Sequence, residues 1–177
     1  MIFETSRLYL RELEQPDFLS LCNILQDPEV MYAYEHPFSD AEVQDWLDRQ
    51  RKNYRNYGFG LWAVIEKTSG EMIGQCGLTM QDYGREKVLE VGYLFQKMFW
   101  HRGFATEAAI ACKVYAFERL QAQEVYSIIR DNNIPSQNVA LRNGMEVCGM
   151  LVKHYYGMDM PHLVFSVKRS KQLDQLT

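Results

Sequence analysis

The sequence predicts an α+β fold, with a mixed but mostly antiparallel sheet and helices on both of its faces. The chain has 177 residues, of which 47% are hydrophobic and 24% charged, so one domain with a substantial core is expected. Several short runs alternate apolar and polar residues and are joined by compact turns, which is typical of antiparallel strands. Other segments repeat apolar residues at helical spacing.

The first half of the chain is expected to form one strand, two helices and a hairpin. Residues 8–12 alternate as in a strand, and residues 17–25 carry apolar side chains at helical spacing before Asp27-Pro28. A capping box, Ser39-Asp40-Ala41-Glu42, opens a helix that runs towards Tyr54. Strands at 61–66 and 72–80 should pair around the turn at 68–71.

The second half is expected to add two helices and four strands. The helix from Phe104 to about Leu120 is almost apolar in its first half, so we expect it to be buried on several sides. A short helix over 135–143 should end at Gly144 as its C-cap. The strands are expected at 88–95, after a turn at 82–86, and at 124–130, 147–156 and 163–168. Because no repeat or linker interrupts this pattern, a single domain should cover 1–177, with its core at about 6–168.

Composition excludes several classes of function. A net charge of −4 argues against a general nucleic-acid binder and weakly favours a cationic or amine-bearing substrate. The four cysteines and four histidines show no metal-ligand spacing, so reduced thiols and no metal are expected. No apolar run could span a bilayer, and the first residues lack a secretion signal, which predicts a cytoplasmic protein without membrane contact.

The most informative segment runs from Trp100 to Ala108, directly after the alternating run from Glu90 to Phe95. A strand leads into a short loop with Arg102 and Gly103, and a helix then begins. The unpaired N–H groups and positive dipole end of a helix start can hold a phosphate. A tight strand-to-helix turn without a ligand explains the same residues equally well. The spacing of the P-loop and of the dinucleotide-binding loop is missing.

A second segment, residues 131–145, combines a strand end, Asn133, Ser136 and the pair Asn143-Gly144. By itself it describes a capped helix, with Asn133 at the N-cap and Gly144 at the C-cap.

In this order and at this separation, the two segments resemble the motifs of the GNAT superfamily of acyl-CoA-dependent N-acetyltransferases. Arg102-Gly103-Phe104-Ala105 matches the last part of the cofactor loop Q/R-x-x-G-x-G/A. Trp100 occupies the Q/R place, and His101 stands where many members carry an additional glycine. These departures are typical of the Rim-type acetyltransferases of ribosomal-protein N-termini, the subgroup that the chain resembles most. Its motifs appear, between about residues 6 and 168, as Ser6-Arg7-Leu8-Tyr9-Leu10-Arg11, Glu90-Val91-Gly92-Tyr93, Gly103 to Ala108, Asn133 with Ser136, and Asn143-Gly144-Met145.

The resemblance implies a GNAT fold in which two central strands splay apart and acetyl-CoA lies between them. Gly92 is compatible with a bulge that opens such a gap. Pantetheine would pair with the strand backbone, pyrophosphate would lie on the start of the helix, and the short helix would flank the thioester and the nucleotide. The implied cofactor-binding residues are Tyr93, Leu94, Phe95, His101, Arg102, Gly103, Phe104, Ala105, Thr106, Asn133, Ser136, Asn138 and Arg142.

Direct attack of an amine on a thioester needs a proton acceptor, an oxyanion donor and a partner for the leaving sulfur. We expect the N–H of Leu94 to hold the oxyanion. The tyrosine that many family members use as the acid is replaced by Ala140, so Ser136 is our candidate, with a capping role as its alternative. Glu90 is the candidate base, acting through water, unless it is only a strand charge or salt-bridge partner. Glu107 is expected to be structural.

The acceptor site is expected in aromatic loops, where Tyr32, Tyr34 and Glu35 would suit a cationic amine and Tyr155 offers a second wall. Core packing is the alternative for individual tyrosines. The predicted function is acetyl transfer from acetyl-CoA to a primary amine, with a peptide N-terminal α-amine as the first candidate. A small-molecule amine acetyltransferase and a catalytically silent acyl-CoA-binding module remain alternatives. The oligomeric state, monomer or homodimer, stays open.

Overall fold

A computed structural model describes residues 1–34, 36–155 and 157–170. Within these residues one eight-stranded sheet runs in the order β1-β2-β3-β4-β5-β6-β8-β7. Every neighbouring pair is antiparallel except β5 and β6, which are parallel. The strands are β1 Phe3–Glu4, β2 Leu8–Arg11, β3 Leu61–Glu66, β4 Met72–Tyr83, β5 Glu86–Phe95, β6 Glu124–Arg130, β7 Glu146–Tyr155 and β8 Met158–Lys168.

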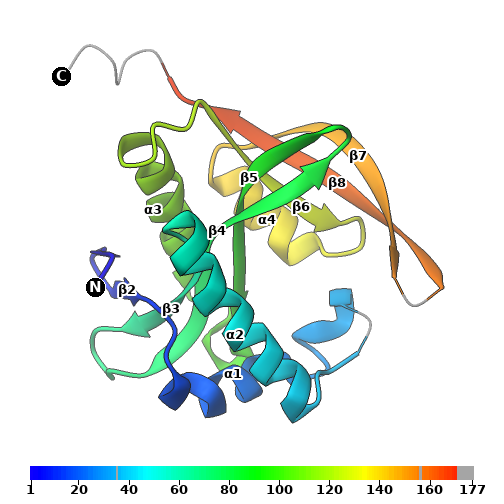
Figure 1. Ribbon diagram of the computed structural model, residues 1–177. Helices are drawn as coiled ribbons and strands as arrows, with labels where there is room; N and C mark the ends of the chain where they lie inside the picture. The colour runs from blue at the N-terminus through cyan, green and yellow to red at the C-terminus, as the bar shows by residue number, and fades with distance from the viewer. Residues whose placement is uncertain (35, 156, 171–177) are drawn as a thin grey trace.

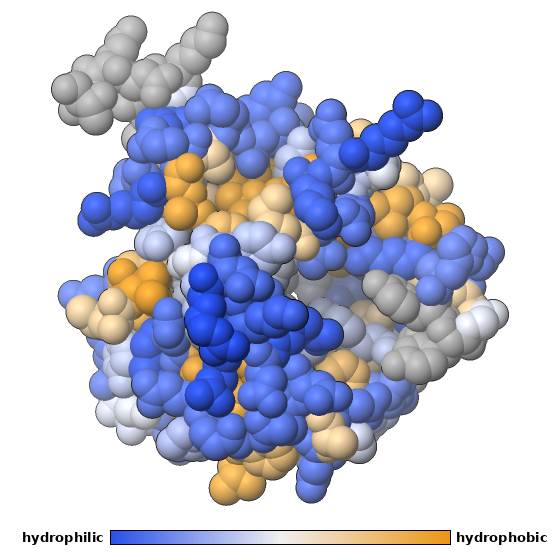
Figure 2. All heavy atoms as spheres, in the orientation of Figure 1, coloured by the Kyte–Doolittle hydropathy of each residue, from blue (hydrophilic) through white to orange (hydrophobic). Residues whose placement is uncertain are grey.

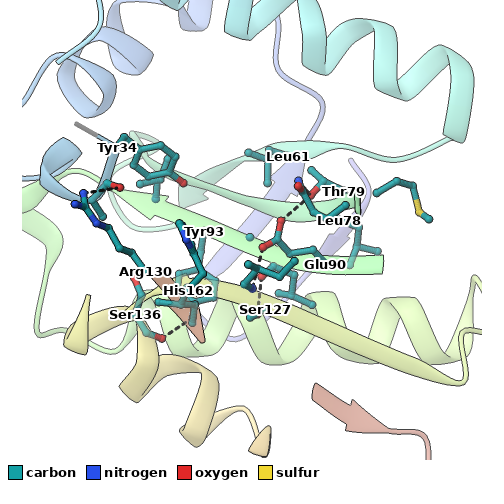
Figure 3. A pocket seen from close by; sticks show the side chains of 18 of the residues that line it. Tyr34, Leu61, Leu78, Thr79, Glu90, Tyr93, Ser127, Arg130, Ser136 and His162 are labelled. Atoms are coloured by element: carbon teal, nitrogen blue, oxygen red, sulfur yellow. Dashed lines mark hydrogen bonds between the residues drawn. The ribbon is translucent and has the colours of Figure 1, made fainter. Parts of the chain in front are cut away.

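Two helix pairs cover the two faces of the sheet. The helices are α1 Phe18–Leu25, α2 Asp40–Tyr57, α3 Phe104–Glu118 and α4 Ile134–Arg142, with short 3₁₀ turns at Gln15–Asp17, Met31–Tyr34 and Lys97–Phe99. α1 contacts α2, and α3 contacts α4 as well as the central strands β4 and β5. Figures 1 and 3 show α2 on one side of the strands and α3 and α4 on the other. None of the described helices is long and apolar enough to cross a membrane.

The predicted helices and strands are all present, with differences at their ends. The capping box of α2 is confirmed, because the Glu42 N–H donates to the Ser39 hydroxyl (3.3 Å) and the Ser39 N–H to the Glu42 carboxylate (2.8 Å). The two-residue strand β1 was not predicted. β4 and β8 are longer than predicted because each continues into a hairpin beyond the core, where pairing between strands replaces burial (Figure 1).

The central strands part without a bulge at Gly92, so that expectation is wrong. β4 and β5 keep one register along their whole length, with Gly77 opposite Gly92. β5 pairs with β6 only at Glu90↔Tyr126, and towards Phe95 the ladder is not continued. The gap therefore results from divergence of a parallel pair, which leaves the β6-facing backbone groups of β5 without a neighbouring strand.

Candidate active site

Two cavities contain residues of the predicted site. The first, of about 490 Å³, is lined by residues of the Met31–Tyr34 turn, α2, β4, β5, β6 and the start of α4. Figure 3 shows Tyr34, Tyr93, Glu90 and Ser136 arranged around it, and Figure 2 shows the surface hollowed beside the hydrophilic outer face of α2. The second, of about 770 Å³, lies at the start of α3 and includes His101, Gly103 and Thr106.

Two side chains hold the diverging strands together where the backbone ladder ends. The Ser127 hydroxyl donates to the Val91 carbonyl (2.8 Å), and the Ile128 N–H donates to the Glu90 carboxylate (3.0 Å). The Thr79 hydroxyl donates to the other oxygen of Glu90 (3.1 Å). Glu90 is thus a wall of the cavity that faces across the gap, rather than an exposed strand charge.

The environment of Glu90 makes it a stronger base than an exposed glutamate. Burial is the main cause of a raised pKa, opposed by the hydrogen bond from Ile128 and by the charge of Lys153. A carboxylate has about four lone-pair sites, so two bound donors leave it able to accept another hydrogen bond. This arrangement fits the predicted role as proton acceptor.

The strand register corrects the expectation for the oxyanion donor. Ile73 and Gln96 form a hydrogen-bonded pair, because the Gln96 N–H donates to the Ile73 carbonyl (3.0 Å). Hydrogen-bonded pairs alternate along an antiparallel ladder, so the Leu94 N–H faces Gln75 on β4 and not the gap. The backbone groups that face the gap are those of Tyr93 and Phe95, and the Trp100 indole N–H donates to the Phe95 carbonyl (2.9 Å).

The start of α4 closes one end of the cavity. Asn133 is the N-cap, since its side-chain oxygen accepts the Ser136 N–H (3.2 Å). That oxygen also accepts the Tyr32 hydroxyl (2.9 Å), and the Ser136 carbonyl accepts the Tyr93 hydroxyl (2.7 Å). Within the described residues the Ser136 hydroxyl makes no hydrogen bond and lines the cavity. Asn133 therefore caps, while the hydroxyl of Ser136 is available to a ligand.

The other predicted acceptor residues are only partly placed. Tyr34 lines the cavity beside Tyr93 (Figure 3). Glu35 lies outside the described residues, as does the side chain of Tyr155 at the end of β7. β7 ends at Tyr155, and the hairpin of β7 and β8 projects from the rest of the sheet (Figure 1).

The loop before α3 adopts the left-handed backbone twice. His101 has φ +59° and Gly103 has φ +80°, which explains why glycine suits both positions. Of the predicted cofactor residues, His101, Gly103, Thr106 and Arg142 line the second cavity. The side chain of Phe104 is buried in the core instead, and Ala105 packs against it, so only their backbone can serve a ligand. Asn138 is exposed on α4 and lines neither cavity.

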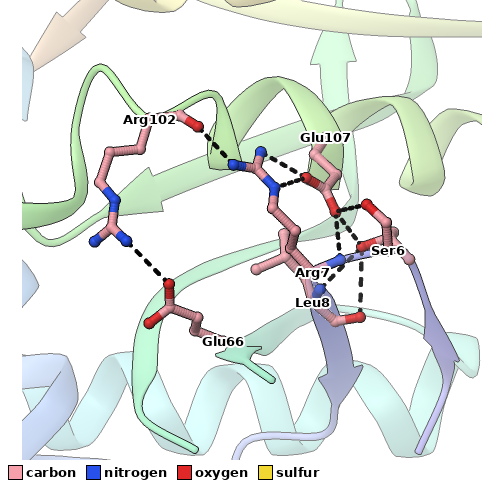
Figure 4. A network of polar contacts seen from close by, with 7 residues as sticks. Ser6, Arg7, Leu8, Glu66, Arg102 and Glu107 are labelled. Atoms are coloured by element: carbon pink, nitrogen blue, oxygen red, sulfur yellow. Dashed lines mark hydrogen bonds and ion pairs between the residues drawn. The ribbon is translucent and has the colours of Figure 1, made fainter. Parts of the chain in front are cut away.

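The side chain of Arg102 is directed towards Glu66 and does not line the second cavity. Its guanidinium forms an ion pair with Glu66 (3.1 Å) and lies over the rings of Phe99 and Phe104, 5.4 and 4.9 Å from their centres. The resemblance implies that Arg102 binds the cofactor, but its side chain is held by Glu66 outside the second cavity. The Arg102 carbonyl accepts a hydrogen bond from Arg7 (2.9 Å), which fixes the loop (Figure 4).

The expectation that Glu107 is structural is supported by its contacts. Its carboxylate accepts hydrogen bonds from the Thr5 hydroxyl (2.6 Å), the Ser6 hydroxyl (3.2 Å), the Arg7 N–H (3.0 Å) and the Arg7 Nε (2.6 Å). Burial raises its pKa, but the bonds from Thr5 and Arg7 outweigh this and hold the pKa below the ordinary value. Glu107 thus ties α3 to the segment before β2 (Figure 4).

The sequence analysis missed His162, which lines the first cavity. Its Nδ1 lies 2.8 Å from the Met160 carbonyl, and a carbonyl only accepts, so Nδ1 carries the proton and Nε2 is an acceptor. Burial lowers the pKa of the imidazole, which keeps it neutral near pH 7. The predicted strand began at 163, and only the pairing of His162 with Arg130 on β6 brings this residue to the site.

The fit to acetyl-CoA rests on shape and on donor groups. The gap leaves strand-like backbone groups at Tyr93 and Phe95, and the start of α3 offers unpaired N–H groups beside the second cavity. No cluster of metal-ligating side chains occurs among the described residues.

Comparison with known proteins agrees with this geometry. The sequence model of the acetyltransferase (GNAT) domain family matches residues 7–146 of this chain. YkkB of Bacillus subtilis is 35% identical over 142 residues, which cover 80% of this chain and 83% of that protein. An acetyltransferase from Agrobacterium tumefaciens has a similar structure (TM-score 0.79, 28% identity, 94% of each chain).

The same fold occurs in the spermidine N-acetyltransferase of Vibrio cholerae in complex with CoA and spermine. The two structures superpose with a TM-score of 0.76 at 21% identity, and the match covers 96% of this chain and 99% of that one. Together with the splayed β5–β6 pair and the loop before α3, the family match shows that the chain belongs to the GNAT family of acetyltransferases and is an N-acetyltransferase.

Proposed function

We propose that the protein transfers the acetyl group of acetyl-CoA to a primary amine by direct attack in a ternary complex. The observation that carries the proposal is the first cavity, which lies where β5 and β6 diverge and is lined by Glu90 and Ser136. The second cavity, at the start of α3, is lined by His101, Gly103 and Thr106. Acetyl-CoA would supply the activated acyl group from the α3 side, and the amine would approach from the α2 side.

Three groups of the chain would handle the charge changes of the reaction. Glu90, with its raised pKa, would take the proton of the attacking amine through water. The N–H of Tyr93 or Phe95, facing the gap, would hold the oxyanion. The Ser136 hydroxyl would hydrogen-bond the leaving sulfur, since Ala140 stands where many family members carry a tyrosine.

A peptide N-terminal α-amine is the first candidate acceptor within this proposal. Its pKa is about 8, against about 10.4 for lysine, so more of it is neutral at cellular pH and a modest base suffices. The similarity of the motifs to the Rim-type subgroup supports the same choice. A small-molecule amine is the second candidate. Composition supports a cytoplasmic protein, which cell fractionation would test. The oligomeric state, monomer or homodimer, stays open, and light scattering would decide it.

The test is thiol release from acetyl-CoA with a panel of amines and N-terminal peptides, followed by mass measurement of the product. A mass increase of one acetyl group on an amine supports the proposal. CoA binding without turnover on a broad panel would instead support the silent acyl-CoA-binding module. Ser136→Ala distinguishes a catalytic from a structural role of this residue. If kcat is unchanged, the hydroxyl does not assist the leaving sulfur, and Ser136 is only a residue of the first turn of α4.

A further inference from the structure

The first cavity has a charge opposite to that of the whole chain. Its lining contains the cationic side chains Arg49, Lys87, Arg130 and Lys153, and Glu90 is the one carboxylate among the described lining residues. The full chain carries a net charge of −4. The positive lining is therefore a local feature of the site.

Most of this positive charge has no anionic partner among the residues that the structure describes. Lys87 forms an ion pair with Asp82 (2.8 Å) at the outer end of the cavity. Among the described residues, no carboxylate forms an ion pair with Arg49, Arg130 or Lys153. The guanidinium of Arg49 lies 4.8 Å from the centre of the Trp46 ring, which leaves its charge unneutralised.

Arg130 and Lys153 line the same cavity as Glu90 and Ser136. Arg130 lies on β6 opposite His162, and its Nη1 donates weakly to the carbonyls of Tyr32 (3.3 Å) and Ala33 (3.5 Å). A guanidinium has five N–H donors, so most of them remain for a ligand. Lys153 lines the cavity from β7, and its charge lowers the pKa values of both Glu90 and His162.

We propose that the acceptor is an amine that also carries an anionic group, a carboxylate or phosphate, which Arg130 and Lys153 bind while the amine faces Glu90. Arginine suits such a group because its planar fork can bind two oxygens at once. A polyamine would place its further positive charges against these cations, and like charges in a partly dehydrated cavity repel. This inference rests on the proposed acetyl transfer and narrows its substrate.

Matched acceptors test the substrate class in the full-length protein. β-Alanine is compared with β-alaninamide, 2-aminoethyl phosphate with 2-aminoethanol, and a Ser-Glu peptide with a Ser-Lys peptide of otherwise equal sequence. Spermidine serves as the polycation. Thiol release gives kcat/KM for each, expressed per neutral amine so that differences in amine pKa cancel. The three pairs distinguish a carboxylate, a phosphate and an acidic peptide as the source of the anion.

We expect the anionic member of at least one pair to exceed its partner by about tenfold or more, with spermidine the poorest acceptor. Raising the salt concentration should reduce this ratio, because salt screens the attraction. If the partners without the anionic group, or spermidine, show equal or higher kcat/KM, the substrate class is overturned and acetyl transfer stays intact. Absence of release with every acceptor overturns acetyl transfer itself, and the substrate class with it.

Substitutions in the cavity test which residues cause the preference for anionic acceptors. Arg130→Gln and Lys153→Gln should each reduce the ratio between paired acceptors to within about threefold. Lys52→Gln, on the exposed side of α2 and outside the cavity, is the matched control and should keep the wild-type ratio. Thermal unfolding verifies that each variant is folded. If both cavity variants fold and keep the wild-type ratio, the assignment is overturned.

Discussion

Replacing Glu107 with alanine tests whether this residue of the Gly103–Ala108 motif is structural or catalytic. The substitution removes a carboxylate that accepts bonds from Thr5, Ser6 and Arg7 and ties α3 to the start of the chain (Figure 4). Arg7 also holds the Arg102 carbonyl in the loop before α3. We therefore expect a loss of stability together with a weaker hold on the cofactor loop.

These contacts determine how much stability the substitution is expected to remove. A hydrogen bond to a charged group contributes about 1.5–3 kcal/mol, and breaking a buried ion pair costs about 3–5 kcal/mol. The side chain of Glu107 is 17% exposed but that of Arg7 is 46% exposed, so water can solvate the Arg7 guanidinium after the substitution and reduce the loss of stability. We expect Glu107→Ala to lower the free energy of unfolding by about 2–4 kcal/mol. Glu107→Gln, which keeps a carbonyl acceptor, should lose about half as much.

Urea unfolding measures this difference. With a slope of about 2 kcal/mol per M, a loss of 3 kcal/mol shifts the midpoint by about 1.5 M. The folded-state pKa of Glu107 lies below its unfolded value, so its contribution is complete above the ordinary glutamate pKa. It is lost as pH falls from that value through the folded-state pKa, and wild type and Glu107→Ala should converge there. Asp48→Asn, in the exposed pair with Arg51, should cost less than about 0.5 kcal/mol as control.

Kinetics separate the two roles. A structural Glu107 predicts kcat within about threefold of wild type and a KM for acetyl-CoA raised severalfold, because the loop loses its tie. A hundredfold loss of kcat with unchanged urea midpoint would refute the reasoning, since it would place Glu107 in the chemistry.

Three further predictions follow from the site. Gly103→Ala should lower the free energy of unfolding by about 1–2 kcal/mol because of the left-handed backbone alone, since the added Cβ would lie at an ordinary contact distance of 3.5 Å from Arg7. His101→Gly should be neutral or slightly stabilising. Thermal unfolding measures both changes, and a neutral Gly103→Ala would contradict the backbone strain. Ser127→Ala, which leaves the Val91 carbonyl unpaired, should cost about 1–3 kcal/mol in urea, and a loss below about 0.3 kcal/mol would remove its role in holding the gap. Glu90→Gln should lower kcat/KM by about 100-fold and abolish the acidic limb of the pH profile. The pKa of Glu90 is raised in the folded state, so wild type should lose stability relative to Glu90→Gln as pH rises from the ordinary glutamate pKa through the folded-state pKa. A stability difference that stays constant across pH would show that the pKa of Glu90 is not raised.

Local patterns predicted the elements because each is specified by neighbouring residues. The capping box at Ser39 is confirmed because its partner Glu42 is only three positions away. The order of the motifs around Gly103 and Asn133 likewise predicted the family, which the family match confirms. In both cases the chemistry depends on short separations along the chain.

Long-range arrangement decided the rest. The alternation of the β4–β5 ladder, which depends on pairing across a hairpin, turned the Leu94 N–H away from the gap and its neighbours towards it. His162 and Arg130 meet only because β8 pairs with β6, and Lys153 joins them through β7.

The sequence by itself determined the fold class and the family, because short motifs specify them, and it predicted the loop that would hold acetyl-CoA. Only the tertiary structure decided which backbone groups face the gap, that Arg102 pairs with Glu66, and that an acidic chain carries a cationic cavity. The physical reason is that orientation and local charge depend on residues brought together from distant strands, which no local pattern encodes.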